Sequence, residues 1–125
     1  MAVCLIAGDS IAVGVASYLP KCTVNAKIGI SSTAIVGRAG NANVLVVSAG
    51  SNDPHNPRLV DNLKHIRAKA SGRVIWIQPI DHVAAAAVRS VAALHGDQIV
   101  TFSPAGDHVH PASDKALADR IRRVM

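Results

Sequence analysis

Short apolar runs alternate along the chain with longer segments in which apolar residues recur every three or four positions. The short runs are rich in Val and Ile, and several of them stop at a Gly or a Ser. Both properties are typical of buried β-strands. The runs predict strands at residues 3–7, 22–28, 44–48, 74–77 and 99–102.

The longer segments carry their apolar residues along one side of a helix. In the clearest case Leu59, Leu63 and Ile66 fall on one helical face, with charged residues on the opposite face. Pro20 and Gly96 lie where two of these segments stop, as expected of helix ends. The pattern predicts helices at residues 11–19, 59–70, 83–94 and 112–124, and a short helix or a turn at residues 31–36.

Strands that alternate with helices favour a parallel sheet, because each crossover has to return over a face of the sheet. We therefore expect a three-layer α/β/α fold. Its five-stranded parallel sheet should have the flavodoxin-like order 2-1-3-4-5, since crossovers are right-handed. No linker or internal repeat interrupts the pattern, so we expect one domain over residues 1–125.

Composition indicates which residues fill the core, and it argues against nucleic acid as a partner. Half of the residues are hydrophobic and only 2% are aromatic, so Ala, Val, Ile and Leu have to fill the core. The net charge of +5 comes largely from residues 64–73 and 120–123, which both fall on predicted helices. Solvent-exposed helix faces explain this positive charge, and the chain lacks the aromatic side chains on which the bases of nucleic acid would stack. Nucleic acid is therefore not an expected partner, whereas an anionic polymer stays open.

Cys4 and Cys22 show no spacing typical of metal ligands. Both fall in or beside buried strands, and we expect two buried thiols, although a bridge between them stays open. The chain begins directly with a strand, without a recognisable leader or an apolar run long enough for a membrane. These features predict a cytoplasmic protein, with export by another route left open.

Polar side chains gather where the predicted strands end. The carboxyl ends of parallel strands lie at one edge of the sheet, where ligands bind in this class of fold. The residues expected at that edge are Asp9, Ser10, Gly29, Asn52, Asp53, His82, Asp107, His108 and His110.

Three of these residues have complementary chemistry. A serine hydroxyl becomes a nucleophile when a base accepts its proton and a third group orients that base. Asp107 and His110 are three positions apart, which lets the carboxylate reach one imidazole nitrogen while the other nitrogen faces Ser10. The sequence thus predicts a Ser10–His110–Asp107 triad.

A nucleophilic serine also needs donors for the oxyanion of its tetrahedral intermediate. The Ser10 N–H, the Gly29 N–H and the Asn52 side-chain amide are the candidates. Gly37 and Gly40 remain rivals of Gly29 for this role, because the segment after the second predicted strand is rich in glycine.

The motifs "GDS" after the first predicted strand, "GSND" after the third and "DHVH" before the last helix resemble the SGNH (GDSL-type) hydrolases. The resemblance spans residues 8–111 and implies Ser10 as nucleophile, Gly29 and Asn52 in the oxyanion hole, and His110 with Asp107 as base and partner. His108 departs from the family, whose members often have glycine after the aspartate.

Simpler interpretations exist for each motif. Ser10 alone is explained as a helix cap, and Asn52 with Asp53 as turn residues. The histidines have no metal-ligand spacing, and no glycine-rich phosphate loop follows the first strand. A receiver-type phosphoacceptor would need a lysine after the fifth strand, and none is there.

We therefore predict a serine esterase that acts on short, acetyl-type acyl groups borne by a small molecule or a polymer, with no metal or organic cofactor. Asp9, Asp53, His82 and His108 are further candidates for substrate contact. The alternatives are a non-catalytic binding module of the same fold, or a lysophospholipase or thioesterase.

Overall fold

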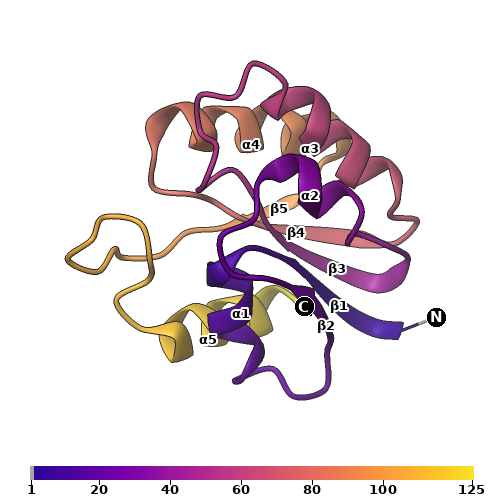
Figure 1. The fold of residues 1–125 in the computed structure, drawn as a ribbon. Coiled ribbons are helices and arrows are strands. Elements are labelled where there is room, and N and C mark those ends of the chain that lie inside the picture. The colour runs from indigo at the N-terminus through magenta and orange to yellow at the C-terminus, as the bar shows by residue number, and fades with distance from the viewer. Residues whose placement is uncertain (1) are drawn as a thin grey trace.

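The computed structural model describes residues 2–125 and forms one five-stranded parallel sheet between two layers of helices (Figure 1). The strand order is β2-β1-β3-β4-β5, the order that the sequence predicts. The elements are β1 (Ala2–Gly8), α1 (Ser10–Ala16), β2 (Thr23–Ala26), α2 (Ser32–Val36), β3 (Ala42–Ser48), α3 (Leu59–Ala68), β4 (Arg73–Ile77), α4 (His82–His95), β5 (Gln98–Val100) and α5 (Asp114–Val124).

Each face of the sheet is covered by its own set of helices. Helices α1 and α5 cover one face, and α2, α3 and α4 cover the other (Figure 1). Side chains of β3 alternate between the two cores, with Val46 on the α1/α5 side and Leu45 and Val47 on the opposite side. This alternation explains the unbroken "VLVV" run, because a strand buried on both faces has no polar side.

Side-chain caps fix several helix boundaries that the apolar pattern alone places a few residues away. The last helix begins at Asp114 rather than at residue 112, because Ser113 Oγ accepts a hydrogen bond from the Ala116 N–H at 3.1 Å. Helix α4 begins at His82, where Asp81 Oδ1 accepts from the Val83 and Ala84 N–H groups. Within residues 2–125, no helix is long and apolar enough to cross a membrane.

The two cysteines form a disulfide, so the expectation of two free buried thiols is wrong. The reason is the register of the two neighbouring parallel strands. Leu5 pairs with Thr23, which brings Cys4 and Cys22 opposite one another with a Cα–Cα separation of 4.6 Å. Spacing along the chain carries no information about that register.

Long connections follow the carboxyl ends of β3 and β5. Residues 49–58 join β3 to α3, and residues 101–113 join β5 to α5. The second of these loops projects beyond the sheet in Figure 1, where it is drawn in orange to yellow. The polar residues expected at the carboxyl edge lie in or beside these connections.

Candidate active site

Ser10 is the first residue of α1 and follows β1 after a sharp exit at Gly8 and Asp9. At Gly8 the backbone passes so close to β3 that a Cβ would overlap the carbonyl oxygen of Ser48. Glycine is therefore required there. The tight exit places Ser10 at the carboxyl edge of the sheet, half-buried.

Asp9 is fully buried beneath the nucleophile position and caps α1. Its Oδ1 accepts hydrogen bonds from the Ile11 N–H at 3.1 Å and from the Ser48 hydroxyl at 2.8 Å. Oδ2 is buried without a hydrogen-bond partner among the described residues. Burial raises the pKa of the Asp9 carboxyl above its ordinary value, although these two hydrogen bonds act in the opposite direction. The carboxyl group faces the start of α1 and β3 rather than the surface.

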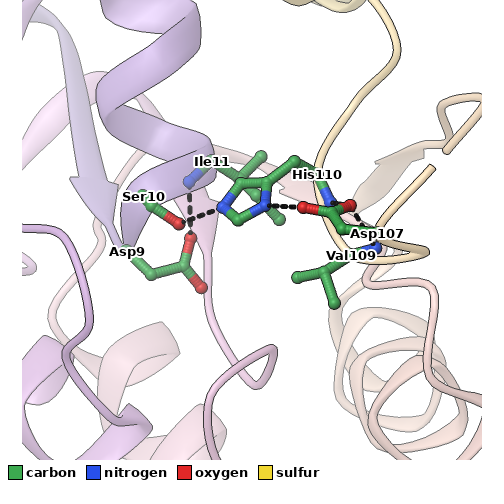
Figure 2. Close-up of polar contacts among 6 residues, drawn as sticks. All are labelled: Asp9, Ser10, Ile11, Asp107, Val109 and His110. Carbon is green, nitrogen blue, oxygen red and sulfur yellow. Dashed lines mark hydrogen bonds and ion pairs between the residues drawn. The ribbon is translucent and has the colours of Figure 1, made fainter. Parts of the chain in front are cut away.

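Ser10, His110 and Asp107 form a continuous chain of hydrogen bonds (Figure 2). The Ser10 Oγ lies 2.7 Å from His110 Nε2, and His110 Nδ1 lies 2.6 Å from Asp107 Oδ2. Ser10 comes from the start of α1, whereas the other two residues lie in the β5–α5 loop. The chain joins residues that are 100 positions apart in the sequence.

The environment of Asp107 determines which nitrogen of the imidazole carries the proton. Asp107 Oδ1 accepts from the backbone N–H groups of Val109 and His110, each at 2.9 Å. The hydrogen bond from the His110 ring, together with these two, holds the pKa of the Asp107 carboxyl far below its ordinary range. An ionised carboxylate only accepts hydrogen bonds, so Nδ1 carries the proton and Nε2 is left to accept from the Ser10 hydroxyl.

Gly29 lies at the same edge of the sheet as Ser10, just after β2, and its φ of 81° is one that glycine adopts without strain. Gly37 instead ends α2, and Gly40 lies before the amino end of β3. Of the three glycines, only Gly29 directly follows the carboxyl end of a strand. Asn52 reaches its loop, because Asn52 Nδ2 donates to the Ile30 carbonyl at 2.9 Å.

Asp53 also contacts the segment that follows Gly29. Its Oδ1 accepts from the Ser32 N–H at 3.0 Å, and its Oδ2 accepts from the Ser32 hydroxyl at 2.6 Å and from Asn56 Nδ2 at 2.9 Å. Both carboxylate oxygens are thus occupied within the protein. The carboxylate connects the β3–α3 loop to the start of α2.

A pocket of about 410 Å³ adjoins the triad at Asp107, which is one of its lining residues. His82 and His108 both line it, and so does Asp81. His108 has a φ of 59°, a left-handed conformation that is uncommon for residues other than glycine. The pocket walls are Ser51, Pro54, Ile80, Asp81, His82, Asp107, His108 and Val109.

Two polar residues near the site, Ser32 and Asn62, were not singled out by the sequence. Asn62 is buried on α3 and donates to Ser32 Oγ at 2.9 Å and to Thr33 Oγ1 at 3.1 Å. A signal for Asn62 exists in the sequence, because it falls on the apolar face of α3 beside Leu63 and Ile66. An amide on a buried face needs polar partners, but nothing local identifies them.

Histidines from several loops come near the site without forming a cluster suited to a metal. His55 Nε2 lies 3.9 Å from Asp81 Oδ2; the His55 side chain is largely exposed and that of Asp81 partly exposed. Across residues 2–125, no group of three or more His, Cys, Asp or Glu side chains is arranged to hold a metal ion.

Comparison with known proteins finds solved structures of similar fold. No family profile and no curated protein match the chain. The catalytic domain of peptidoglycan O-acetyltransferase A from Streptococcus pneumoniae, solved with a methylsulfonyl adduct, is 17% identical with a TM-score of 0.62, covering 96% of this chain and 90% of that one. A Bacteroides fragilis protein provisionally described as an acylhydrolase is 17% identical with a TM-score of 0.73, covering 97% of this chain and 85% of that one.

Both similarities extend over nearly the whole chain, and at this identity they establish the fold. The chain therefore has the α/β fold that the resemblance to SGNH hydrolases implies. The names of both structures refer to acyl groups, which is a property of those proteins; the chemistry of this chain has to be argued from its own residues.

Proposed function

We propose that this protein is a serine hydrolase of carboxylic esters, with Ser10 as nucleophile, His110 as general base and Asp107 as its orienting partner. The observation that carries the proposal is the hydrogen-bonded chain from Ser10 Oγ through the His110 ring to Asp107. Each member has the partner that its role requires, and the ionised Asp107 leaves the correct nitrogen free to accept the serine proton.

In the proposed reaction, His110 Nε2 takes the proton of Ser10 Oγ as the oxygen attacks the acyl carbonyl. The tetrahedral intermediate then expels the alcohol, which receives that proton from His110, and an acyl-Ser10 ester remains. Water, deprotonated by the same imidazole, attacks this ester; the bond between the acyl carbon and Ser10 Oγ then breaks, His110 returns the proton to Ser10 Oγ, and the acid is released. The ionised Asp107 stabilises the imidazolium in both steps.

The oxyanion of each tetrahedral intermediate would be held by the Ser10 N–H, the Gly29 N–H and the Asn52 side-chain amide. The Ser10 N–H belongs to the first turn of α1, where backbone N–H groups have no acceptor within the helix. Asn52 Nδ2 has two hydrogens, and its bond to the Ile30 carbonyl uses one and orients the other. The loss of one such donor lowers kcat by roughly 10²–10³ in comparable sites.

The shape of the site favours a short acyl group, such as acetyl. Ser10 is half-buried and His110 is exposed at the edge of the sheet, and neither residue lines the neighbouring pocket of about 410 Å³, whose walls combine apolar side chains with Asp81, His82 and His108. An acyl group on Ser10 would therefore lie at the exposed edge of the sheet, which favours a short one. The pocket beside Asp107 suits the alcohol portion of the ester, and His82 and His108 are the residues placed to contact it.

The disulfide between Cys4 and Cys22 supports an oxidising location. Disulfides persist in secreted and periplasmic proteins and are rare in the cytosol, where thiols are kept reduced. We therefore propose that the protein works outside the cytosol, in place of the cytoplasmic location that the sequence predicts.

Ester hydrolysis by a Ser10→Ala variant tests the proposed function. With p-nitrophenyl acetate, we expect the variant to lose nearly all kcat, because the hydroxyl that forms the proposed acyl-enzyme is removed. Ser17→Ala is the matched control, since Ser17 is exposed at the other end of the same helix, where its hydroxyl donates to the Gly14 carbonyl. Full activity in Ser10→Ala would contradict the proposal.

The same assay separates the proposal from its alternatives. A binding module that has lost turnover would give no ester hydrolysis in the wild-type protein at any chain length. A lysophospholipase or thioesterase would prefer long acyl chains or thioesters over acetate esters.

A further inference from the structure

Two of the proposed oxyanion donors come from strands that do not touch. Gly29 follows β2 and Asn52 follows β3, and β1 lies between these strands in the sheet. The hydrogen bonds of the sheet therefore do not set the distance between the two donors. Another contact has to hold the two loops together at the edge of the sheet.

Packing around Gly29 does not supply this contact. The residue is exposed, and a Cβ built on it would meet no atom within 4 Å. The preceding strand β2 is a short edge strand of four residues, three of them exposed. Before Gly29, the Lys27 N–H donates to the Gly8 carbonyl at 3.0 Å. The position of the glycine itself depends further on the hydrogen bonds that follow it.

Three of those hydrogen bonds lead to two consecutive residues of the β3–α3 loop. Asn52 binds the Ile30 carbonyl at 2.9 Å, and Asp53 accepts from the N–H and the hydroxyl of Ser32 at 3.0 and 2.6 Å. Ser31, at the N-cap of α2, makes no side-chain cap of its own. The carboxylate of Asp53 therefore caps α2 from a different loop.

Both ends of this connection are themselves anchored. Asn56 Nδ2 donates to Asp53 Oδ2 at 2.9 Å, and the buried Asn62 of α3 donates to Ser32 Oγ at 2.9 Å. The Ser32 side chain is fully buried, so its bonds are shielded from competing water. The carboxylate of Asp53 has no remaining freedom to turn toward the surface.

We propose that Asp53 is a positioning residue for catalysis: its carboxylate joins the Gly29 loop to the Asn52 loop and so sets the separation of the two oxyanion donors. This inference rests on the proposed function, because it assigns to Asp53 a role within the same site. Asp53 acts through Ser32 and touches neither substrate nor the reacting atoms.

Asp53→Asn and Asp53→Ala make the first test, with hydrolysis of p-nitrophenyl acetate as the measurement. An Asn side chain can still accept from the Ser32 N–H through its Oδ1. Its Nδ2 would then face Asn56 Nδ2, and because both groups are donors, no hydrogen bond forms between them. Alanine removes every contact. Displaced oxyanion donors are expected to lower kcat on the order of 10- to 100-fold in Asp53→Ala and less in Asp53→Asn, with KM nearly unchanged.

Asp61→Asn is the matched control for the loss of one negative charge, because Asp61 is exposed in the first turn of α3. Its kinetics are expected to equal those of the wild type. A kcat of both Asp53 variants equal to that of this control would overturn the inference. A raised KM with unchanged kcat would also overturn it, since that result would make Asp53 a substrate contact.

Ser32→Ala provides a second variant that leaves the Asp53 carboxylate in place. It removes the hydroxyl but keeps the N–H bond, so a smaller loss of kcat is expected than for Asp53→Ala. In the double variant with Asp53→Ala, kcat should fall no further than in Asp53→Ala alone, because both changes break the same connection. Losses that multiply would contradict a shared role.

Amide hydrogen exchange, followed by NMR, tests whether Asp53 joins the two loops, and this measurement does not depend on catalytic activity. In Asp53→Ala, the Ser32 amide is expected to exchange faster and the Gly29 amide signal to shift, whereas Asp61→Asn should leave both unchanged. Unchanged amides in Asp53→Ala would overturn the inference. If the wild-type protein hydrolyses no ester and Ser10 is unreactive, the proposed function fails and the catalytic role of Asp53 fails with it. The exchange data would still show whether the two loops are joined.

Discussion

At the scale of single residues, Asp107 does more than orient an imidazole. Its Oδ1 holds the turn that carries His110, and its Oδ2 fixes the tautomer of the ring. The sequence predicted the partnership from the spacing of three, since such a spacing brings the side chain back over the same turn. The two backbone contacts were not predicted, because they depend on the detailed path of the loop.

Asp107→Asn is expected to lower kcat on the order of 10²–10⁴-fold, because the Asn amide would donate toward Nδ1 and place the ring proton on Nε2, where it faces Ser10. Asn retains the Oδ1 acceptor, so the loop should keep its fold. The measurement is the rate of p-nitrophenyl acetate hydrolysis, with thermal unfolding as the check on structure. Activity equal to wild type would show that the proposed base needs no carboxylate.

Asp9 gives a prediction about stability rather than activity. Because burial raises the pKa of Asp9 above 3.8, the folded state binds the proton more tightly than the unfolded state. The folded protein therefore loses stability as pH rises from about 3.8 through the raised pKa. Asp9→Asn keeps the acceptor for Ile11 and Ser48 but carries no charge.

The free energy of unfolding of Asp9→Asn, relative to wild type, should accordingly increase with pH across that window and then level off. Urea unfolding at a series of pH values measures it. Asp9→Ala is the control for the lost helix cap and should be less stable than Asp9→Asn throughout. A difference between Asp9→Asn and wild type that does not change with pH would contradict a charged, buried Asp9.

At the scale of elements, the apolar pattern predicted the order of the strands and helices and the type of each one except residues 31–36, which it left as a short helix or a turn. The pattern is clear because the central strands are buried on both faces and each major helix has one apolar side. Boundaries were less certain where a polar side chain decides them, as Ser113 does at the start of α5. Contacts between elements were the least predictable. The disulfide depends on the register of β1 against β2, and the Ser32–Asp53 bonds join residues 21 positions apart.

The disulfide closes a loop that contains β1 from Cys4 onward, the nucleophile position and all of α1. Cross-linking a loop of this length restricts the unfolded chain, which is typically worth about 3 kcal/mol. The Cys4→Ala/Cys22→Ala variant should lose about this much free energy of unfolding. Trp76, the only tryptophan, is fully buried and reports the transition by its fluorescence.

Wild-type protein treated with a reducing agent is the control for that measurement, because it loses the bond without a change of side chain. It should unfold at the same denaturant concentration as the double variant. An unfolding midpoint that neither reduction nor substitution changes would show that the bond contributes no stability.

At the scale of the whole molecule, the fold brings five connections to one edge of the sheet, and the proposed triad and oxyanion donors are distributed over four of them. The sequence predicted this convergence from topology alone, since all strands of a parallel sheet end on the same side. It did not predict the pocket beside Asp107. The pocket arises from the packing of the β3–α3, β4–α4 and β5–α5 connections. The sequence of any one of these connections does not indicate the shape of the pocket.

That shape predicts how activity varies with the acyl chain. Across p-nitrophenyl esters of increasing chain length, kcat/KM should be highest for acetate and fall for longer acyl groups, because Ser10 is only half-buried and His110 is exposed at the edge of the sheet. The series is measured below the concentration at which the longer esters form micelles. A maximum at a long chain would contradict the proposed preference and favour a lipid substrate.

The most direct test of the central claim is covalent labelling by a serine-directed phosphonate, read by intact-protein mass. We predict one adduct on the wild type and on Ser17→Ala, mapped to Ser10 by peptide analysis, and no adduct on Ser10→Ala. Labelling of Ser10→Ala to the same extent as wild type, or an unreactive wild-type protein, would contradict a nucleophilic Ser10.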